Sequence, residues 1–467
     1  MRGAPTISQV EASAPEKAQH TSHAIVIGTG VAGLLAAGAL TRHFDRITLL
    51  ERDTLNGAEI RRGIPQARHL HGLMEGGRAI MEQLYPGLTD EMVAAGAPTT
   101  HVLSGSRWYL SGLRAKPTET GLTTLLASRA LLEYGLRTRA AALPGVQIVE
   151  QTVVNGLVVT DGRVTGVQTA TGTVAADLVV DATGRASRTP DWLRANGFEA
   201  PDEDSIEVDL GYASRTYVHQ PEHLDGQLGV VVSTMAGRRG GGAIVLEGGR
   251  WHVTLGGMLG DHPPTDHEGF TAFAATLPVG DIHRIITDAE PIDDPVPHRF
   301  RGSLRRRYEN VAGPEGLVVL GDALCSFNPL YAQGMTVAGQ QALALDACLH
   351  AGRDDLPARF YAAAARYVDV AWRMSTGSDL NHPGVEGERP LRQRVLSAYV
   401  LRAHRAAHVD AKVARTFMRV ANLVDGPENL LKPEMIARIL WHSSRVAPLP
   451  ANSTEETRNS MVTGVKS

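Results

Sequence analysis

Cysteine and long apolar runs are what this sequence has least of. Cys325 and Cys348 are its only cysteines in 467 residues. Two cysteines cannot form a disulfide framework or a thiolate metal cluster, and their scarcity favours a reducing, cytoplasmic compartment. No window reaches the roughly 18 uninterrupted apolar residues of a membrane span, so we expect no transmembrane helix.

The sequence also has little net charge and few aromatic side chains. The formal net charge is −4, which gives no electrostatic reason to expect nucleic acid as a partner. Aromatic residues make up 5% of the chain, which slightly disfavours an aromatic cage for the substrate. Residues 1–22 are polar without an apolar segment, so we predict a disordered leader rather than a signal peptide. We also expect a mobile tail at 448–467.

A glycine motif near the amino end carries the clearest signal. Ala24–Ile27 is an apolar run typical of a buried parallel strand, and Gly28, Gly30 and Gly33 follow it at G-x-G-x-x-G spacing. The first glycine allows a tight turn, the second lets a pyrophosphate approach the backbone, and the third lets the next helix approach the sheet. We therefore predict a phosphate site at the start of that helix.

The segment after the glycines strengthens this interpretation. Val31–Leu40 predicts a helix of small and apolar residues, and Ile47–Leu50 predicts a second strand that ends at Glu51. A carboxylate at this position can accept hydrogen bonds from both ribose hydroxyls. The segment thus predicts a dinucleotide with a free ribose 2′-OH, either FAD or NAD.

A basic loop follows the second strand. It contains Arg61, Arg62 and Arg68, together with His69 and His71. Directly after a nucleotide-binding strand, this positive charge would face a pyrophosphate. A metal site at the two histidines lacks a further ligand in any recognisable spacing, so we predict none.

The rest of the chain divides by pattern. Asp177–Asp181 and Gly316–Ala323 return to apolar strands of the first sheet, whereas 206–297 predicts an antiparallel sheet with glycine-rich turns. Ser128 is a plausible N-cap for a helix that opens with Arg129, where a nearby anion would explain the arginine. Residues 356–447 predict a series of helices.

Two later motifs lead to a family resemblance. One is Asp181-Ala-Thr-Gly-Arg-Ala-Ser-Arg188, and the other runs from Gly321-Asp322 through Pro329 to Gly334-Met335. Together with the glycine motif, they resemble FAD-dependent monooxygenases of the para-hydroxybenzoate hydroxylase type over residues 23–345. The chain is more closely similar to the bacterial flavin epoxidases of polyether biosynthesis, the monensin and lasalocid type, through 62–71, 181–190 and 327–335.

The resemblance implies an α/β fold in which a Rossmann-like FAD-binding domain is interleaved with an antiparallel-sheet substrate domain and followed by a helical C-terminal region. The expected division is a leader at 1–22; an FAD domain at 23–100, 125–205 and 298–350; a sheet domain at 101–124 and 206–297; helices at 351–447; and a tail at 448–467.

The resemblance also implies the residues that contact FAD. The ADP half would be held by Gly28, Gly30, Gly33, Glu51 and Arg52, with Arg129 beside the pyrophosphate and Val153 beside the adenine. The ribityl chain and flavin edge would be held by Asp322, Pro329, Gly334 and Met335. Arg62 is the one candidate catalytic residue, as an arginine on the flavin side.

Two departures from the family pattern concern function. The family's Asp-Gly pair, which is linked to NADPH use, is replaced by Thr183-Gly184. Electrons could then come from NAD(P)H directly or through a separate flavin reductase. Where the family commonly has histidine after its Gly-Asp motif, this chain has Cys325, which we interpret as a small buried core residue.

The expected reaction is transfer of one oxygen atom from O₂, through a flavin C4a-hydroperoxide, to a hydrophobic biosynthetic substrate. Alkene epoxidation of a polyene or polyketide is favoured. The alternatives are an aromatic hydroxylase, a flavin-dependent reductase of isoprenoid double bonds and a non-catalytic flavoprotein. A flavin halogenase should carry Trp-x-Trp-x-Ile-Pro, which the sequence lacks.

Overall fold

A five-stranded parallel sheet forms the centre of one half of the molecule. The computed structural model describes residues 21–61, 65–234 and 237–447. All pairings in this sheet are parallel. Its spatial order is β17 (Leu317–Val319), β11 (Leu178–Asp181), β1 (His23–Ile27), β2 (Arg46–Leu50) and β7 (Val146–Val149).

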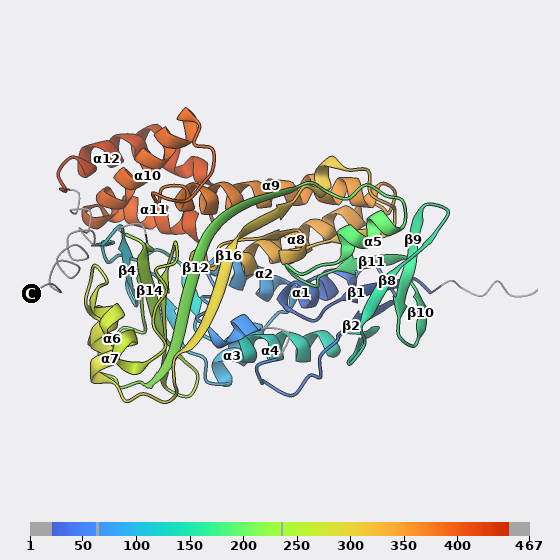
Figure 1. Ribbon diagram of the computed structural model, residues 1–467, viewed down its shortest axis with the longest axis horizontal. Helices are drawn as coiled ribbons and strands as arrows, with labels where there is room; N and C mark the ends of the chain where they lie inside the picture. Colours follow the sequence, from blue (N-terminus) through green and yellow to red (C-terminus); the bar gives the residue numbers. More distant parts are fainter. Residues whose placement is uncertain (1–20, 62–64, 235–236, 448–467) are drawn as a thin grey trace, which may run out of the picture.

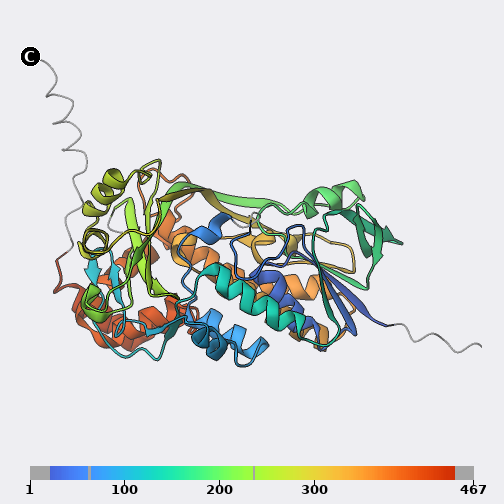
Figure 2. The same cartoon turned by 90° about the horizontal axis from the view of Figure 1, so that it is seen from below.

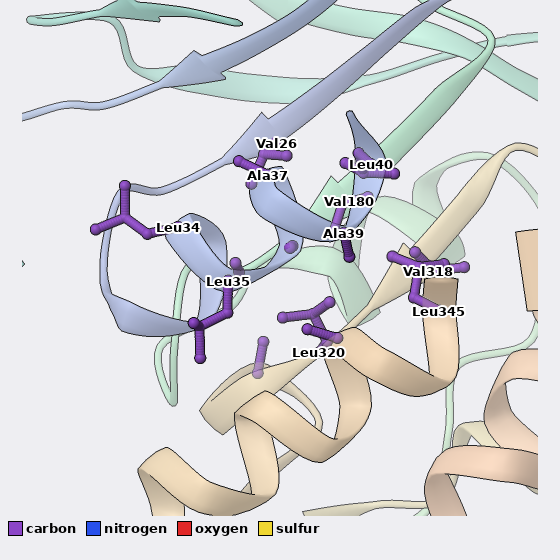
Figure 3. Packing of buried hydrophobic residues seen from close by; sticks show 14 of the residues in the cluster. Val26, Leu34, Leu35, Ala37, Ala39, Leu40, Val180, Val318, Leu320 and Leu345 are labelled. Carbon is purple, nitrogen blue, oxygen red and sulfur yellow. The ribbon is translucent and has the colours of Figure 1, made fainter. Parts of the chain in front are cut away.

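Helix α1 (Val31–Leu40) lies almost wholly inside this half. Its alanines, glycines and leucines allow close packing on the sheet on one side and on α8 (Gly334–His350) on the other. Figure 3 shows Leu34 and Leu35 of α1 in the same core as Leu345 of α8. Helix α9 (Leu356–Asp379) packs along α8.

An eight-stranded sheet forms the other half. Its order is β18 (Cys325–Ser326), β16 (Val296–Arg306), β12 (Glu203–Val218), β15 (Arg250–Gly257), β14 (Arg239–Leu246), β13 (Gly229–Val232), β4 (Arg107–Leu110) and β5 (Leu113–Arg114). Figures 1 and 2 show β12 and β16 side by side, extending from this sheet along the first half. Helices α6 (His267–Ala275) and α7 (Asp281–Asp288) share an apolar core with one face.

Three C-terminal helices form a separate layer at the end of the molecule (Figure 1). They are α10 (Leu391–Val409), α11 (Ala411–Ala421) and α12 (Pro433–Ser443). Their buried residues share a core with the segment that contains β4 and β5. This contact joins the carboxyl end of the chain to the sheet half.

The remaining elements connect these layers. The helices are α2 (Glu75–Leu84), α3 (Leu88–Ala94), α4 (Arg129–Ala141) and α5 (Thr189–Ala195). The strands are β3 (Thr99–His101) with β6 (Thr123–Leu125), and a three-stranded sheet of β8 (Val154–Thr160), β9 (Arg163–Thr169) and β10 (Gly172–Ala175). No helix in the described ranges has the length and apolarity needed to cross a membrane.

The predicted fold class is confirmed, and the bounds of several elements differ from expectation. The expected division at 297/298 falls inside β16, because that strand pairs with β12 as far as Arg306. The division of the chain into domains otherwise stays a prediction. Val230 and Val232 of β13 belong to the apolar core of the eight-stranded sheet. The predicted leader and tail lie outside the described residues, apart from Thr21 and Ser22.

Candidate functional site

The carboxyl ends of four neighbouring parallel strands bring the sequence motifs together. Gly28 follows β1, Glu51 follows β2, Asp181 ends β11, and Gly321 follows shortly after β17. The backbone N–H of Gly28 donates to Leu50 O at 2.8 Å, which ties the glycine turn to the neighbouring strand. In open α/β sheets this edge is where ligands bind. We call it the strand-end site.

The three glycines of the first motif meet different surroundings. A Cβ at Gly33 would lie 2.0 Å from the carbonyl oxygen of Gly28, and Gly28 itself has a φ of +98°. Gly28 therefore requires glycine because of its backbone conformation, and Gly33 requires it because α1 approaches the glycine turn closely. A Cβ at Gly30 would meet no atom within 4 Å. Gly30 thus borders open space at the start of α1, whose first turn contains no acid.

Glu51 is held as a buried, ionised acceptor. Its carboxylate accepts from the N–H of Thr29 at 3.0 Å, from the N–H of Asp53 at 3.0 Å and from Arg61 Nη1 at 2.9 Å. Burial alone would raise the pKa of this carboxyl, but the hydrogen bonds from Thr29 and Asp53 and the charge of Arg61 lower it overall. The group is therefore charged at neutral pH, and its Oε2 already accepts from Thr29 and Arg61.

An arginine pair beside Glu51 was only partly predicted. Arg61 Nη2 donates to Glu133 at 2.6 Å, and Arg129 Nε donates to the other oxygen of Glu133, also at 2.6 Å. Ser128 caps α4 as expected, by accepting from the N–H of Leu131. The basic loop predicted that Arg61 faces a pyrophosphate, whereas the structure pairs it with Glu51 and Glu133. Glu133 was not assigned to the site from sequence. The available signal was an acid four residues after Arg129, on the same side of a helix.

Asp322 lies near the start of α8 and within reach of the charges of Arg129 and Arg185. Solvent reaches its side chain, yet the surrounding protein raises the pKa of its carboxyl, an effect opposed by the charges of Arg129 and Arg185. A side chain at Gly334 would begin 3.8 Å from Asp322 Oδ1. Helix α8 begins at Gly334 with no acid in its first turn and no capping side chain, so its N-terminal dipole is uncompensated there.

The eight-stranded sheet presents an aromatic and hydroxyl-bearing face next to this site. The guanidinium of Arg185 lies 5.3 Å from the ring centre of Phe300. His69 is buried, lies 4.6 Å from the ring of Tyr212, and shares a 2.9 Å hydrogen bond with Ser214. Its second nitrogen, Nε2, has no partner within the described part of the chain.

The two histidines of the basic loop are not joined by further metal ligands in the described part of the chain. His71 Nδ1 is 2.8 Å from the carbonyl oxygen of His69, so this nitrogen is engaged with the backbone. Within the described ranges, no group of three or more histidine, cysteine or acidic residues could hold a metal ion.

The other predicted contacts are placed less centrally. Arg52 and Pro329 are exposed, Met335 is partly buried, and Val153 is 49% exposed, although its neighbour Thr152 donates to Glu51 O at 2.8 Å. Arg62 lies outside the described residues. Cys325 is buried in the core, where burial raises the pKa of its thiol.

Asp181 has a local role in its turn. Its carboxylate accepts from Thr183 Oγ1 at 2.7 Å, Ser187 Oγ at 2.5 Å and Thr189 Oγ1 at 2.6 Å. These bonds hold the Ala-Thr-Gly turn that brings Arg185 toward Asp322. The motif thus shapes the strand-end site through its backbone.

Known proteins resemble this arrangement along most of the chain. Residues 120–200 match the family model described as tryptophan halogenase. Over 448 residues the chain is 33% identical to protein Rv3254 of Mycobacterium tuberculosis, covering 91% of this chain and 94% of that protein. The chain belongs to the Rv3254 family.

More distant matches place this Rv3254-family chain among flavoprotein folds. It is 27% identical over 375 residues to kynurenine 3-monooxygenase of Salinispora tropica, covering 76% of this chain and 79% of that protein. A flavoprotein/dehydrogenase from Cytophaga hutchinsonii superposes with a TM-score of 0.66 at 15% identity, covering 91% and 98% of the two chains. The Rv3254-family chain has the FAD-binding fold of the flavin-dependent monooxygenases and halogenases.

Proposed function

We propose that this chain is an FAD-dependent monooxygenase that transfers one oxygen atom from O₂ to a hydrophobic biosynthetic substrate, with alkene epoxidation as its reaction. The strand-end site is the observation that supports it. Gly30 has room for a phosphate, Glu51 is a charged acceptor, and Asp322 lies beside the uncapped start of α8. These three features match the successive parts of FAD.

Each part of FAD would have a defined partner. The pyrophosphate would lie at the N–H groups of α1 with Arg129 alongside, and a ribose would bind Glu51. Asp322 would accept a ribityl hydroxyl, and the N-terminus of α8 would stabilise negative charge on the flavin edge. Bound FAD, once reduced, supplies the activation of O₂. The chain's own task is to orient the substrate and exclude water.

The electron source and one residue complete the proposal. We propose NAD(P)H, used directly or through a separate flavin reductase, as the source of electrons. Arg62 is retained as the proposed arginine on the flavin side. The expected contacts of Arg52, Val153, Pro329 and Met335 with the cofactor also remain proposals.

Aromatic hydroxylation is the second candidate function. The rings of His69, Tyr212 and His298 cluster on the sheet face, with hydroxyls of Ser214 and Thr254 beside them. Such a face can bind a flat substrate that carries polar groups. Similarity to kynurenine 3-monooxygenase supports the same reading. The match to the halogenase family model comes without the Trp-x-Trp-x-Ile-Pro stretch.

Replacing Asp322 by alanine tests the cofactor assignment. We expect FAD binding to weaken by about 10- to 100-fold, because a hydrogen bond to a charged group contributes roughly 1.5–3 kcal/mol. Stability of the apo-protein should change little, because the side chain is exposed. Titration of apo-protein with FAD, followed by fluorescence, measures the effect. Glu434→Ala, an exposed acid on α12, is the matched control. Equal FAD affinity in wild type and D322A would contradict the assignment.

Oxygen transfer itself is tested with isotopic O₂. The FAD-loaded protein, reduced with NADPH or a flavin reductase, is incubated with ¹⁸O₂ and panels of polyenes and aromatics. Mass spectrometry should find one ¹⁸O atom per oxidation, as an epoxide in a polyene or as a phenol for the second candidate. Addition of chloride or bromide tests for halogenation. Hydrogen peroxide as the sole product with every compound would count against oxygen transfer.

A further inference from the structure

A fully buried carboxylate lies at the end of α9, behind the loop that leads into α8. The side chain of Asp379 has no solvent exposure. Its Oδ1 accepts from Asn328 Nδ2 at 2.8 Å and from the hydroxyl of Tyr331 at 2.8 Å. One oxygen atom thus holds two residues that are about 50 positions away in the sequence.

The two donors are the first and last residues of the short turn 328–331. Asn328 also shapes the turn, because its Oδ1 accepts from the N–H of Leu330 at 3.1 Å and its own N–H donates to Ser303 Oγ at 3.1 Å. Ser303 belongs to β16. The turn is therefore fixed to α9 on one side and to the eight-stranded sheet on the other.

This turn separates the substrate face from the start of α8. Leu330 Cδ2 lies 3.5 Å from where a side chain at Gly256 would begin, on the same sheet face as Tyr212. Gly334 follows Tyr331 by three residues and lies beside Asp322. A shift of the turn would therefore change the separation between the flavin edge and the substrate face. Oxygen transfer depends steeply on such a distance.

Burial of the Asp379 carboxylate costs free energy that packing alone does not explain. Its second oxygen, Oδ2, is buried and has no partner among the described residues. Burial raises the pKa of the carboxyl to about 6, although Tyr331 and Asn328 act in the opposite direction. An apolar side chain of similar volume would avoid the cost of burying a charge. The carboxylate instead fixes the position of the turn through its hydrogen bonds to Asn328 and Tyr331.

We propose that Asp379 is a positioning residue that holds the turn 328–331 through Asn328 and Tyr331 and thereby sets the placement of the flavin edge relative to the substrate face. This inference rests on the proposed function, since it assumes that FAD binds along Asp322 and Gly334.

The test compares four variants on the FAD-loaded full chain. Asp379→Leu removes both hydrogen bonds, whereas Asp379→Asn keeps Oδ1 as the acceptor. Tyr331→Phe removes one bond to Asp379. Tyr361→Phe is the matched control, because its buried hydroxyl accepts from Val319 N–H at 3.0 Å and does not bond to the turn. The readouts are the FAD dissociation constant, the visible absorption spectrum and the midpoint potential of bound FAD, with circular dichroism to verify folding.

We expect D379L to raise the FAD dissociation constant about tenfold and to shift both the spectrum and the potential. Y331F should produce smaller changes of the same kind. D379N and Y361F should remain within about twofold of wild type, within the usual scatter of such measurements.

Three outcomes would overturn the proposal. One is wild-type values in D379L and Y331F. Another is an equal loss in D379N and D379L, which would assign the effect to charge rather than to position. The third is loss of folding in D379L together with wild-type values in Y331F, which would leave Asp379 a structural residue. A wild-type chain that takes up no FAD would overturn the proposed function before any variant is compared.

Discussion

Replacing Gly30 by valine is expected to abolish FAD binding while the apo-protein stays folded. Position 30 has φ −70° and ψ 177°, which valine adopts readily, and its Cβ would enter open space. The same space is where the pyrophosphate would contact the start of α1. We expect the dissociation constant for FAD to rise by at least about 100-fold. The unfolding free energy should change by less than about 0.5 kcal/mol, because the new Cβ meets no protein atom within 4 Å.

Gly33→Ala is the matched change with the opposite outcome. Its Cβ would lie 2.0 Å from the backbone oxygen of Gly28, so either α1 or the glycine turn must move. Overpacking against side chains costs roughly 1–3 kcal/mol, and a backbone obstacle should reach or exceed that range. Urea unfolding of the apo-proteins and FAD titration measure the two effects separately. FAD binding by G30V, or wild-type stability of G33A, would contradict this account of the motif.

Moderate acid is expected to destabilise the protein strongly. Burial lowers the pKa of His69 to about 3 and that of His382 and His404 to about 4. All three side chains are buried. A depressed folded-state pKa means that the stabilisation is fully present above the unfolded value of about 6.5 and is lost as pH falls below it. At pH 5 each histidine should therefore cost about 2 kcal/mol of unfolding free energy.

Asp379 works in the other direction, because its pKa is raised to about 6. As the pH falls, its carboxyl is protonated in the folded state before it is protonated in the unfolded chain. This adds about 1 kcal/mol to the unfolding free energy between pH 7.5 and pH 5. For these four groups alone, the expected net loss over that range is about 5 kcal/mol, a large part of a typical domain's stability.

His404→Gln isolates one contribution to the acid sensitivity. His404 lies in α10, where its Nδ1 is 2.8 Å from Ser111 Oγ, and its ring packs edge-on against Phe417 at 4.8 Å. Urea unfolding of the apo-protein at pH 7.5 and pH 5 should show a pH dependence about 2 kcal/mol smaller in the variant. An unchanged pH dependence would mean that His404 has the same pKa in the folded and unfolded chain.

Features that depend on neighbouring residues in the chain could be predicted from the sequence better than contacts between distant segments. The helix Val31–Leu40 and the cap at Ser128 follow from neighbours in the chain, and the structure confirms both. The strand-end geometry was also foreseeable, because parallel strands end at a common edge.

Side-chain networks between distant segments were not foreseeable. Arg61 and Glu133 are 72 positions apart, and Asn328 and Asp379 are 51 apart. Their pairing depends on how α4 and α9 pack, which no local pattern encodes. The antiparallel sheet was expected from residue 206, but β12 begins at Glu203, which was missed for a related reason. The first residues of β12 are polar, and they pair with β16 about a hundred positions later.

The strand order of the parallel sheet has a consequence for how the chain folds as it is synthesised. Strands β11, β1, β2 and β7 all lie within residues 23–181, whereas β17 joins β11 only from residue 317. During synthesis of the intervening segment, the apolar β11 is therefore an open sheet edge, which invites pairing with another chain. We expect chains released before residue 317 to aggregate, and Asp322 to reach its place only after that edge has closed.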